Sequence, residues 1–250
     1  RATPNYPLPE IKPVLEEIRK ISDLGFDYFE LAMDPPCAHY ATLLDMEQEF
    51  VQALDRAAMD LVCHLPTFVY TADLTPAIRE TSLKEMIYSL RAAARLGAQK
   101  AVVHPSFISG LGPFVMETAT EYARESLAAI ILEGETLGIQ LCLENMFPRY
   151  QSWFEPAHFA SIFKEFPRLK MTLDTGHANM GDPGRTRLHE FIQRFPDRIG
   201  HIHVSDNGGS RDEHLPVGQG NINFKKFAAL LAQAGYQDTL TLEIFSPNPG

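Results

Sequence analysis

The sequence predicts an α/β protein that folds as a single (β/α)8 barrel, the TIM barrel, with parallel strands inside and helices outside. Short apolar runs alternate with amphipathic stretches of helical length, which is the pattern of repeated βαβ units. Carboxylates or imidazoles stand at or near the ends of most of these apolar runs. The 250 residues contain no linker or shift in composition, so we expect one domain over residues 1–250.

The helices follow from apolar residues at helical spacing. Near the start of the chain, Ile11, Val14, Leu15 and Ile18 form one stripe, and Gly25 supplies a stop. The same pattern predicts further helices over residues 45–56, 76–96, 117–137, 157–163, 187–195 and 224–234.

A short apolar run follows each predicted helix, and we interpret each run as a strand. The seven strands are expected in residues 26–33, 59–64, 100–104, 139–144, 169–174, 198–206 and 239–245. An eighth strand, which would open the barrel, is expected within residues 1–8. An open doubly wound sheet is the structural alternative, but such a sheet gathers its ligands at one crevice and would not use nearly every strand end.

Candidate metal ligands occur where these strands end. Parallel strands closed into a barrel bring their carboxyl ends to one face, so distant residues would share one pocket. Histidine, aspartate and glutamate are ligands of zinc and manganese, and carboxylates gathered in one place repel each other unless a cation is present. We therefore predict a divalent-metal site built from His64, His104, Glu144, Asp174, His177, His203, Asp212, His214 and Glu243.

Strand alternation decides which side chains face this site. Successive residues of a strand point to opposite faces, so His201 and His203 share one face and His203 lies nearer the carboxyl end. We therefore expect His203 rather than His201 to be the ligand. In the same way Thr241 lies one layer below Glu243.

Composition restricts the class of partner. The chain has 22 basic and 32 acidic residues, a formal net charge of −10, so nucleic-acid binding is disfavoured. Cys37, Cys63 and Cys142 form no C-x-x-C pair, which favours a reducing compartment. With no apolar stretch of membrane-spanning length and no signal peptide, we expect a cytoplasmic enzyme without a membrane partner.

The nine candidate ligands, with their D-T-G-H and D-E-H spacings, resemble those of the xylose-isomerase-like barrel superfamily from about Pro9 to Phe245. The segments HLPTF, VVHP, LENM and DEHLPVGQGNI are similar to its sugar phosphate isomerase/epimerase group. The superfamily also includes the endonuclease IV type of AP endonuclease. The resemblance therefore implies a metal-dependent enzyme, and it leaves two reactions open.

The first reaction is isomerisation or epimerisation of a sugar or sugar phosphate. Resemblance to the epimerases implies a manganese or zinc ion that lowers the cost of an enediolate, with Glu144 and Glu243 exchanging the substrate proton. The implied ligands of this ion are Glu144, Asp174, His203 and Glu243. The expected substrate-binding residues are His177, Arg211 and Trp153.

The second reaction is phosphodiester hydrolysis by a trinuclear zinc enzyme of the endonuclease IV type. In that branch five further positions complete the three-ion set, and they match His64, His104, His177, Asp212 and His214. The loops after the strands argue against DNA, because LPTFVYTADL and MFPRYQSWFEP are aromatic and acidic rather than basic. A barrel that binds a sugar or metal without turnover is a third alternative, and a homo-oligomer is left open.

Two loop features bear on the substrate. Aromatic residues that could enclose a small ligand, with plain loop packing as the alternative, are Phe68, Phe147, Tyr150, Trp153 and Phe154. Gly218 and Gly220 precede the last predicted helix, where backbone N–H groups of barrel loops often bind phosphate. A lone G-x-G is a weak signal, and a tight turn explains it more readily than phosphate binding does.

Overall fold

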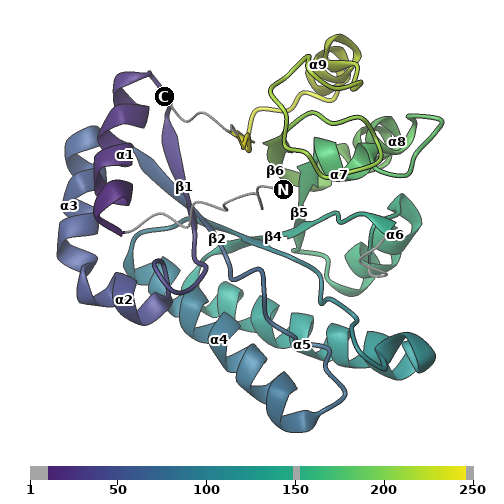
Figure 1. The fold of residues 1–250 in the computed structure, drawn as a ribbon, viewed down its shortest axis with the longest axis horizontal. Helices are drawn as coiled ribbons and strands as arrows, with labels where there is room; N and C mark the ends of the chain where they lie inside the picture. The colour runs from purple at the N-terminus through teal and green to yellow at the C-terminus, as the bar shows by residue number, and fades with distance from the viewer. Residues whose placement is uncertain (1–10, 149–152, 246–250) are drawn as a thin grey trace, which may run out of the picture.

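The computed structural model of the protein describes residues 11–148 and 153–245, with only the backbone at residues 11–13. Seven parallel strands form one sheet, and each strand pairs with the next strand in the chain. The sheet curls into a nearly closed barrel that is surrounded by helices (Figure 1). The strands are β1 Tyr28–Ala32, β2 Asp60–His64, β3 Lys100–Val103, β4 Gln140–Glu144, β5 Lys170–Asp174, β6 Ile199–Val204 and β7 Thr239–Leu242.

This arrangement confirms the predicted (β/α)8 fold class and all seven predicted strands. The two ends of the sheet meet inside the barrel, where the Tyr28 hydroxyl of β1 lies 2.9 Å from Thr241 Oγ1 of β7. The predicted eighth strand in residues 1–8 lies outside the described residues.

The helices confirm the predicted alternation, with differences at two places. The helices are α1 Ile11–Asp23, α2 Tyr40–Asp45, α3 Glu47–Ala57, α4 Pro76–Arg95, α5 Met116–Leu137, α6 Pro156–Glu165, α7 Thr175–Asn179, α8 Arg187–Arg194 and α9 Phe224–Gln233. The helix predicted over residues 45–56 corresponds to α3, and the short helix α2 before it was not predicted; Met46 separates the two with a non-helical backbone of φ −113° and ψ 13°. The helix α7 was not predicted either, because its five residues are too few to show helical periodicity.

Alternation along the strands separates an apolar outer layer from a polar inner one. In β4, Leu141 and Leu143 belong to the hydrophobic core between the sheet and the helices, whereas Glu144 belongs to a polar cluster inside the barrel. In β6, Ile202 joins the same core, and His203 belongs to the inner cluster. The fold therefore holds Glu144 and His203 on strands rather than on loops.

The helical layer is closed by well-packed aromatic side chains. Phe159 of α6 and Phe191 of α8 are fully buried and meet edge to face with ring centroids 5.3 Å apart, a contact of about 0.5–1.5 kcal/mol beyond area burial. Among the helices of the described residues, none combines the length and apolar character that crossing a membrane would need.

Candidate metal centre

All nine predicted ligands lie at one end of the barrel: eight form three groups, of which the first two share Glu144, and Glu243 contacts His203 of the second group. Within each group, one ligand atom from each residue lies within 4.8 Å of the others. The first group is His64, His104 and Glu144; the second is Glu144, Asp174 and His203; the third is His177, Asp212 and His214.

Glu144, the last residue of β4, lies at the centre of this arrangement, and its side chain is 1% exposed. Its Oε2 atom is 3.1 Å from His104 Nε2 and 3.4 Å from His64 Nε2. Its Oε1 atom is 3.0 Å from His177 Nδ1. Because these histidines come from β2, the segment after β3, and α7, the carboxylate joins strand ends that are distant in sequence.

The second group, extended by Glu243, is called the four-ligand group here: Glu144, Asp174, His203 and Glu243. His203 Nδ1 is 3.6 Å from Glu144 Oε2, 3.3 Å from Glu243 Oε2 and 3.9 Å from Asp174 Oδ2. Each of these four atoms is buried and makes no hydrogen bond. A buried polar atom without a partner costs about 1–3 kcal/mol, so four such atoms directed at one point fit a bound cation. The donor set, three carboxylates and one imidazole, suits zinc or manganese.

The third group lies nearer the surface. Asp212 Oδ2 is 3.4 Å from His177 Nε2 and 3.1 Å from His214 Nε2, and the Asp212 side chain is 26% exposed. His214 has a left-handed backbone with φ 46°, and its Nδ1 lies 3.1 Å from the backbone oxygen of Glu243. A carbonyl only accepts hydrogen bonds, so Nδ1 carries the proton and Nε2 is left to face Asp212.

Similar contacts orient two more imidazoles. His64 Nδ1 donates to the Leu65 carbonyl at 2.9 Å, so in the neutral ring Nε2, which faces Glu144, is the bare nitrogen. His203 Nε2 donates to Glu30 Oε1 at 2.9 Å, so in the neutral ring Nδ1, which faces the carboxylates, is the bare nitrogen. Such outer contacts set the tautomer of metal-binding histidines.

The electrostatics of the cluster follow from burial opposed by close charges. Burial raises the pKa of Asp174 to about 7, and the charges of Glu144 and Glu243 add to this effect. Burial would lower the pKa of His64, but its contact with Glu144 raises it to about 9. His214 reaches a pKa of about 9 in the same way, because of Asp212 and Glu243.

In three other members of the cluster, neighbouring charges outweigh burial and shift the pKa in the opposite direction. Burial would raise the pKa of Glu144, but the charges of His104 and His203 hold it well below its usual range. Burial would lower the pKa values of His177 and His203, but the neighbouring carboxylates raise both well above the usual value. The cluster therefore holds a high density of both charge signs in a dry site.

Glu30 is a member of this region that the sequence analysis missed. Its Oε1 contacts His203 Nε2 at 2.9 Å, and its Oε2 contacts His201 Nε2 at 3.0 Å. Burial would raise the pKa of Glu30, but the two histidines hold it well below its usual range. The available signal was a glutamate inside an apolar strand, on the same face as Tyr28.

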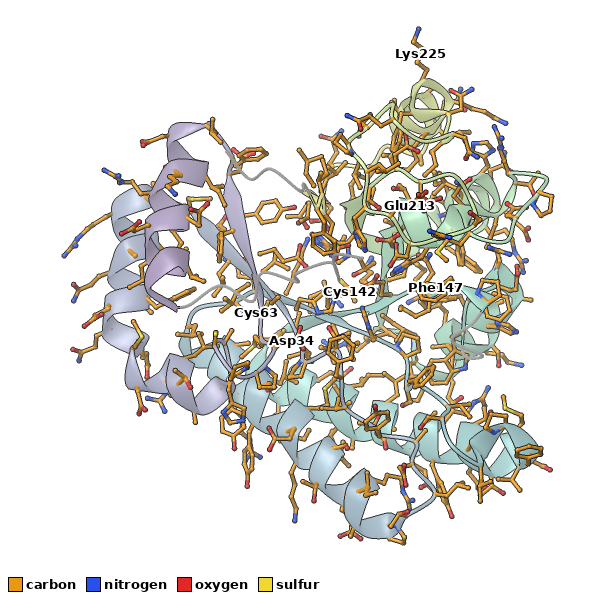
Figure 2. All side chains as sticks on the ribbon, in the orientation of Figure 1. Asp34, Cys63, Cys142, Phe147, Glu213 and Lys225 are labelled. Atoms are coloured by element: carbon orange, nitrogen blue, oxygen red, sulfur yellow. The ribbon has the colours of Figure 1, made fainter. Side chains whose placement is uncertain are left out.

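The predicted substrate-binding residues lie in three different environments. His177 belongs to the cluster, and the ring of Phe147 lies against it with centroids 5.1 Å apart. Figure 2 shows Phe147 beyond the end of β4, on the side of α6. Arg211 is exposed, and Trp153 is 6% exposed and packs in the hydrophobic core.

The remaining loop aromatics are also dispersed. Phe68 is 75% exposed, and Phe154 lies edge-on to His158. Tyr150 lies outside the described residues.

The glycines before α9 form a tight turn around a buried carboxylate. Asp206 accepts hydrogen bonds from the backbone N–H groups of Gly218 at 2.9 Å and Ile222 at 3.1 Å. A Cβ on Gly220 would lie 2.3 Å from Asp206 Oδ1. The turn alternative therefore explains this G-x-G, and the Gly218 N–H is engaged by protein rather than open to a phosphate.

The fold and the site together define a class of TIM-barrel proteins that carry acidic and histidine side chains at the carboxyl ends of the strands. Residues 18–250 match the family described as xylose isomerase-like TIM barrel, and the chain belongs to this family.

The proteins similar to this chain include an uncharacterised protein, a probable endonuclease and an epimerase-like structure. The chain is 29% identical to the uncharacterised protein MJ1311 of Methanocaldococcus jannaschii over 94% of its own length and 80% of that protein. It is 27% identical to a probable endonuclease 4 of Bacillus velezensis over 66% of its own length and 59% of that protein. Among solved structures it is similar to a D-tagatose 3-epimerase-like protein, with a TM-score of 0.80 and 26% identity over 90% of this chain and 84% of that one.

Proposed function

We propose that the protein is a divalent-metal-dependent enzyme that isomerises or epimerises a sugar or sugar phosphate by proton transfer. The observation that carries this proposal is the four-ligand group, in which four buried, unpartnered atoms converge and two of them belong to glutamates. The similarity to a D-tagatose 3-epimerase-like structure supports the same reaction class.

A divalent ion in the four-ligand group would supply Lewis-acid polarisation of the substrate carbonyl and its adjacent hydroxyl, which lowers the cost of an enediolate. The chain's own contribution is to hold and move the proton. Asp174 cannot move freely, because its Oδ1 accepts from the His177 backbone N–H at 2.5 Å and its backbone N–H donates to Asn145 Oδ1 at 2.9 Å. We therefore assign Asp174 a binding role only.

Glu144 and Glu243 are left as the proton-transferring pair. Glu144 ends β4 and Glu243 follows β7, with β5 and β6 between these two strands in the sheet, and both carboxylates approach His203 Nδ1 within 4 Å. The Glu243 side chain is 29% exposed and Glu144 is 1% exposed. In this proposal Glu243 meets the substrate from the open side and Glu144 from the enclosed side, and one returns the proton that the other removes.

The surroundings favour a small neutral or anionic sugar over a nucleic-acid duplex. The segments that follow the seven strands contain three arginines, no lysine and eight acidic residues. Phosphate backbones are bound chiefly by lysine and arginine, so this face is poorly equipped to hold DNA. His177 and Arg211 are the proposed contacts to substrate oxygens.

A second candidate, a trinuclear zinc phosphodiesterase, is favoured by one specific observation. Glu144 is shared between the group with His64 and His104 and the group with His203, while Asp212 anchors a third group. Three adjacent ion sites with a bridging carboxylate suit the attack of water on a phosphodiester and the stabilisation of its leaving oxygen. The similarity to a probable endonuclease 4 agrees with this alternative.

The test is exchange of carbon-bound hydrogen with solvent. Protein loaded with Mn²⁺ or Zn²⁺ is incubated in D2O with ketohexoses and with ketopentose phosphates, and NMR follows deuterium entering the carbon beside the carbonyl. We expect exchange in the wild type and a loss of roughly 10²-fold or more in Glu144→Gln and Glu243→Gln. Glu133→Gln, which alters only an ion pair between Arg91 and Glu133 on the outer helices, is the matched control and retains exchange.

The competing reaction has its own assay. Incision of duplex DNA at an abasic site by the same metal-loaded protein, without exchange on any sugar, would replace the first proposal with the second. Exchange without incision supports the first proposal.

A further inference from the structure

Glu30 lies in the middle of β1, one layer below the four-ligand group, and its side chain is 9% exposed. In the described part of the chain, His203 is the member of the four-ligand group with which Glu30 forms a hydrogen bond. Its second oxygen is bound to His201, which lies two residues before His203 on β6. The carboxylate therefore spans two imidazoles on the same face of one strand.

The proton positions in this layer follow from the partners. A carboxylate with two imidazole neighbours accepts from both, so His201 and His203 each donate through Nε2. His201 Nδ1 then accepts from the Thr239 hydroxyl at 2.7 Å. Each group in this layer has a partner, and the Tyr28 hydroxyl extends the network through Thr241.

This complete pairing distinguishes Glu30 from the residues above it. Members of the four-ligand group each have a buried atom without a hydrogen bond, whereas both oxygens of Glu30 are bonded to imidazole nitrogens. Glu30 is therefore suited to holding a ring in place rather than to contacting an ion itself.

We propose that Glu30 is a positioning residue of the metal centre, because its carboxylate accepts the Nε2 proton of His203 and thereby keeps Nδ1 bare and directed at the ion. This role rests on the metal site proposed above. Without an acceptor the Nε2–H group would be buried and unpartnered, which costs about 1–3 kcal/mol. The ring would then favour a rotated position or the other tautomer, whose Nδ1 proton blocks metal binding.

The test measures metal binding rather than turnover. Zn²⁺ affinity is determined by competition with a chromophoric chelator for the wild type and for Glu30→Met, which keeps the approximate size of the side chain and removes both acceptor oxygens. We expect binding to weaken by about 10–100-fold. Tyr28→Phe, a change in the same layer and strand that does not touch His203, is the matched control and should bind within about threefold of the wild type, because it leaves the Glu30 contacts in place.

Two further measurements separate positioning from a general loss of charge or of fold. In a His203→Ala background, Glu30→Met should have little effect on affinity, because the ring that Glu30 positions is gone. In the zinc-loaded wild type, ¹⁵N NMR should show the proton of His203 on Nε2, and this measurement does not depend on the folding of any variant.

Three results would overturn the role of Glu30 alone, and a fourth would overturn the metal centre. Unchanged Zn²⁺ affinity in folded Glu30→Met, a loss that persists in the His203→Ala background, or a proton on Nδ1 of His203 in the wild type overturns the role of Glu30 and leaves the metal centre standing. Wild-type protein that binds no Zn²⁺ overturns the centre itself, and the role of Glu30 with it.

Discussion

Loading the centre with Zn²⁺ at pH 7 should release protons, and the number released should report how many ions bind. In the metal-free protein the pKa values of His64 and His214 are about 9, and those of His177 and His203 are raised well above the usual value. All four rings therefore carry an extra proton at pH 7. Only a neutral imidazole binds a metal ion, so each ring must lose that proton.

The number depends on which groups are filled. An ion in the four-ligand group displaces the proton of His203 and, since the pKa of Asp174 is about 7, about half a proton from Asp174, or about one and a half in total. Ions in all three groups also displace the protons of His64, His177 and His214, which brings the total to about four and a half. His104 adds nothing, because burial lowers its pKa.

The assay is calorimetric titration of metal-free protein with Zn²⁺ in buffers of different ionisation enthalpy. Protons compete with the metal for the same nitrogen atoms, so the apparent affinity should fall as the pH falls through about 9, where His64 and His214 take up their protons. Tight binding at pH 7 without proton release would refute the assignment of these histidines as ligands.

Three shorter predictions concern metal removal, packing and thiol reactivity. Chelation should lower the thermal midpoint, because a ligand at about 1,000 times its Kd stabilises the fold by about 4 kcal/mol; an unchanged midpoint would contradict a resident ion. Gly220→Ala should cost about 1–3 kcal/mol in denaturant unfolding, since its Cβ would overlap Asp206, and a wild-type midpoint would show that the turn can relax. A maleimide should modify native protein at Cys37 only, because Cys63 and Cys142 are fully buried and burial raises the pKa of Cys142 to about 12; the denatured protein should react at all three, and native labelling of Cys63 would contradict this packing.

The two buried thiols lie on strands, where successive side chains alternate between the two faces of the sheet. Figure 2 shows Cys63 and Cys142 in the middle of the fold, whereas Lys225 points away from α9 into solvent. Such alternation and the apolar periodicity are local properties of the chain, which is why seven strands and most helices could be predicted from sequence. The six residues of α2 are too few to show helical periodicity, so this helix could not be predicted in the same way.

The same difference between local sequence and long-range contacts applies to the site. The nine candidate ligands could be named because each stands at or near a strand end, and a parallel barrel brings those ends together. Their grouping could not, because it depends on side chains such as His64 and Glu144 that are distant in sequence. Glu30 was missed for the same reason, since its partner His203 is on a strand at the other end of the sheet. Trp153 was expected beside the substrate because it is aromatic and in a loop, yet it packs in the core.

The most direct test of the metal centre is an anomalous difference map from crystals grown with Zn²⁺ or Mn²⁺. We expect a peak about 2.0–2.3 Å from Glu144, Asp174, His203 and Glu243, and further peaks beside His64 and His214 if the trinuclear alternative holds. A metal-replete crystal without a peak among the four ligands would contradict the central claim.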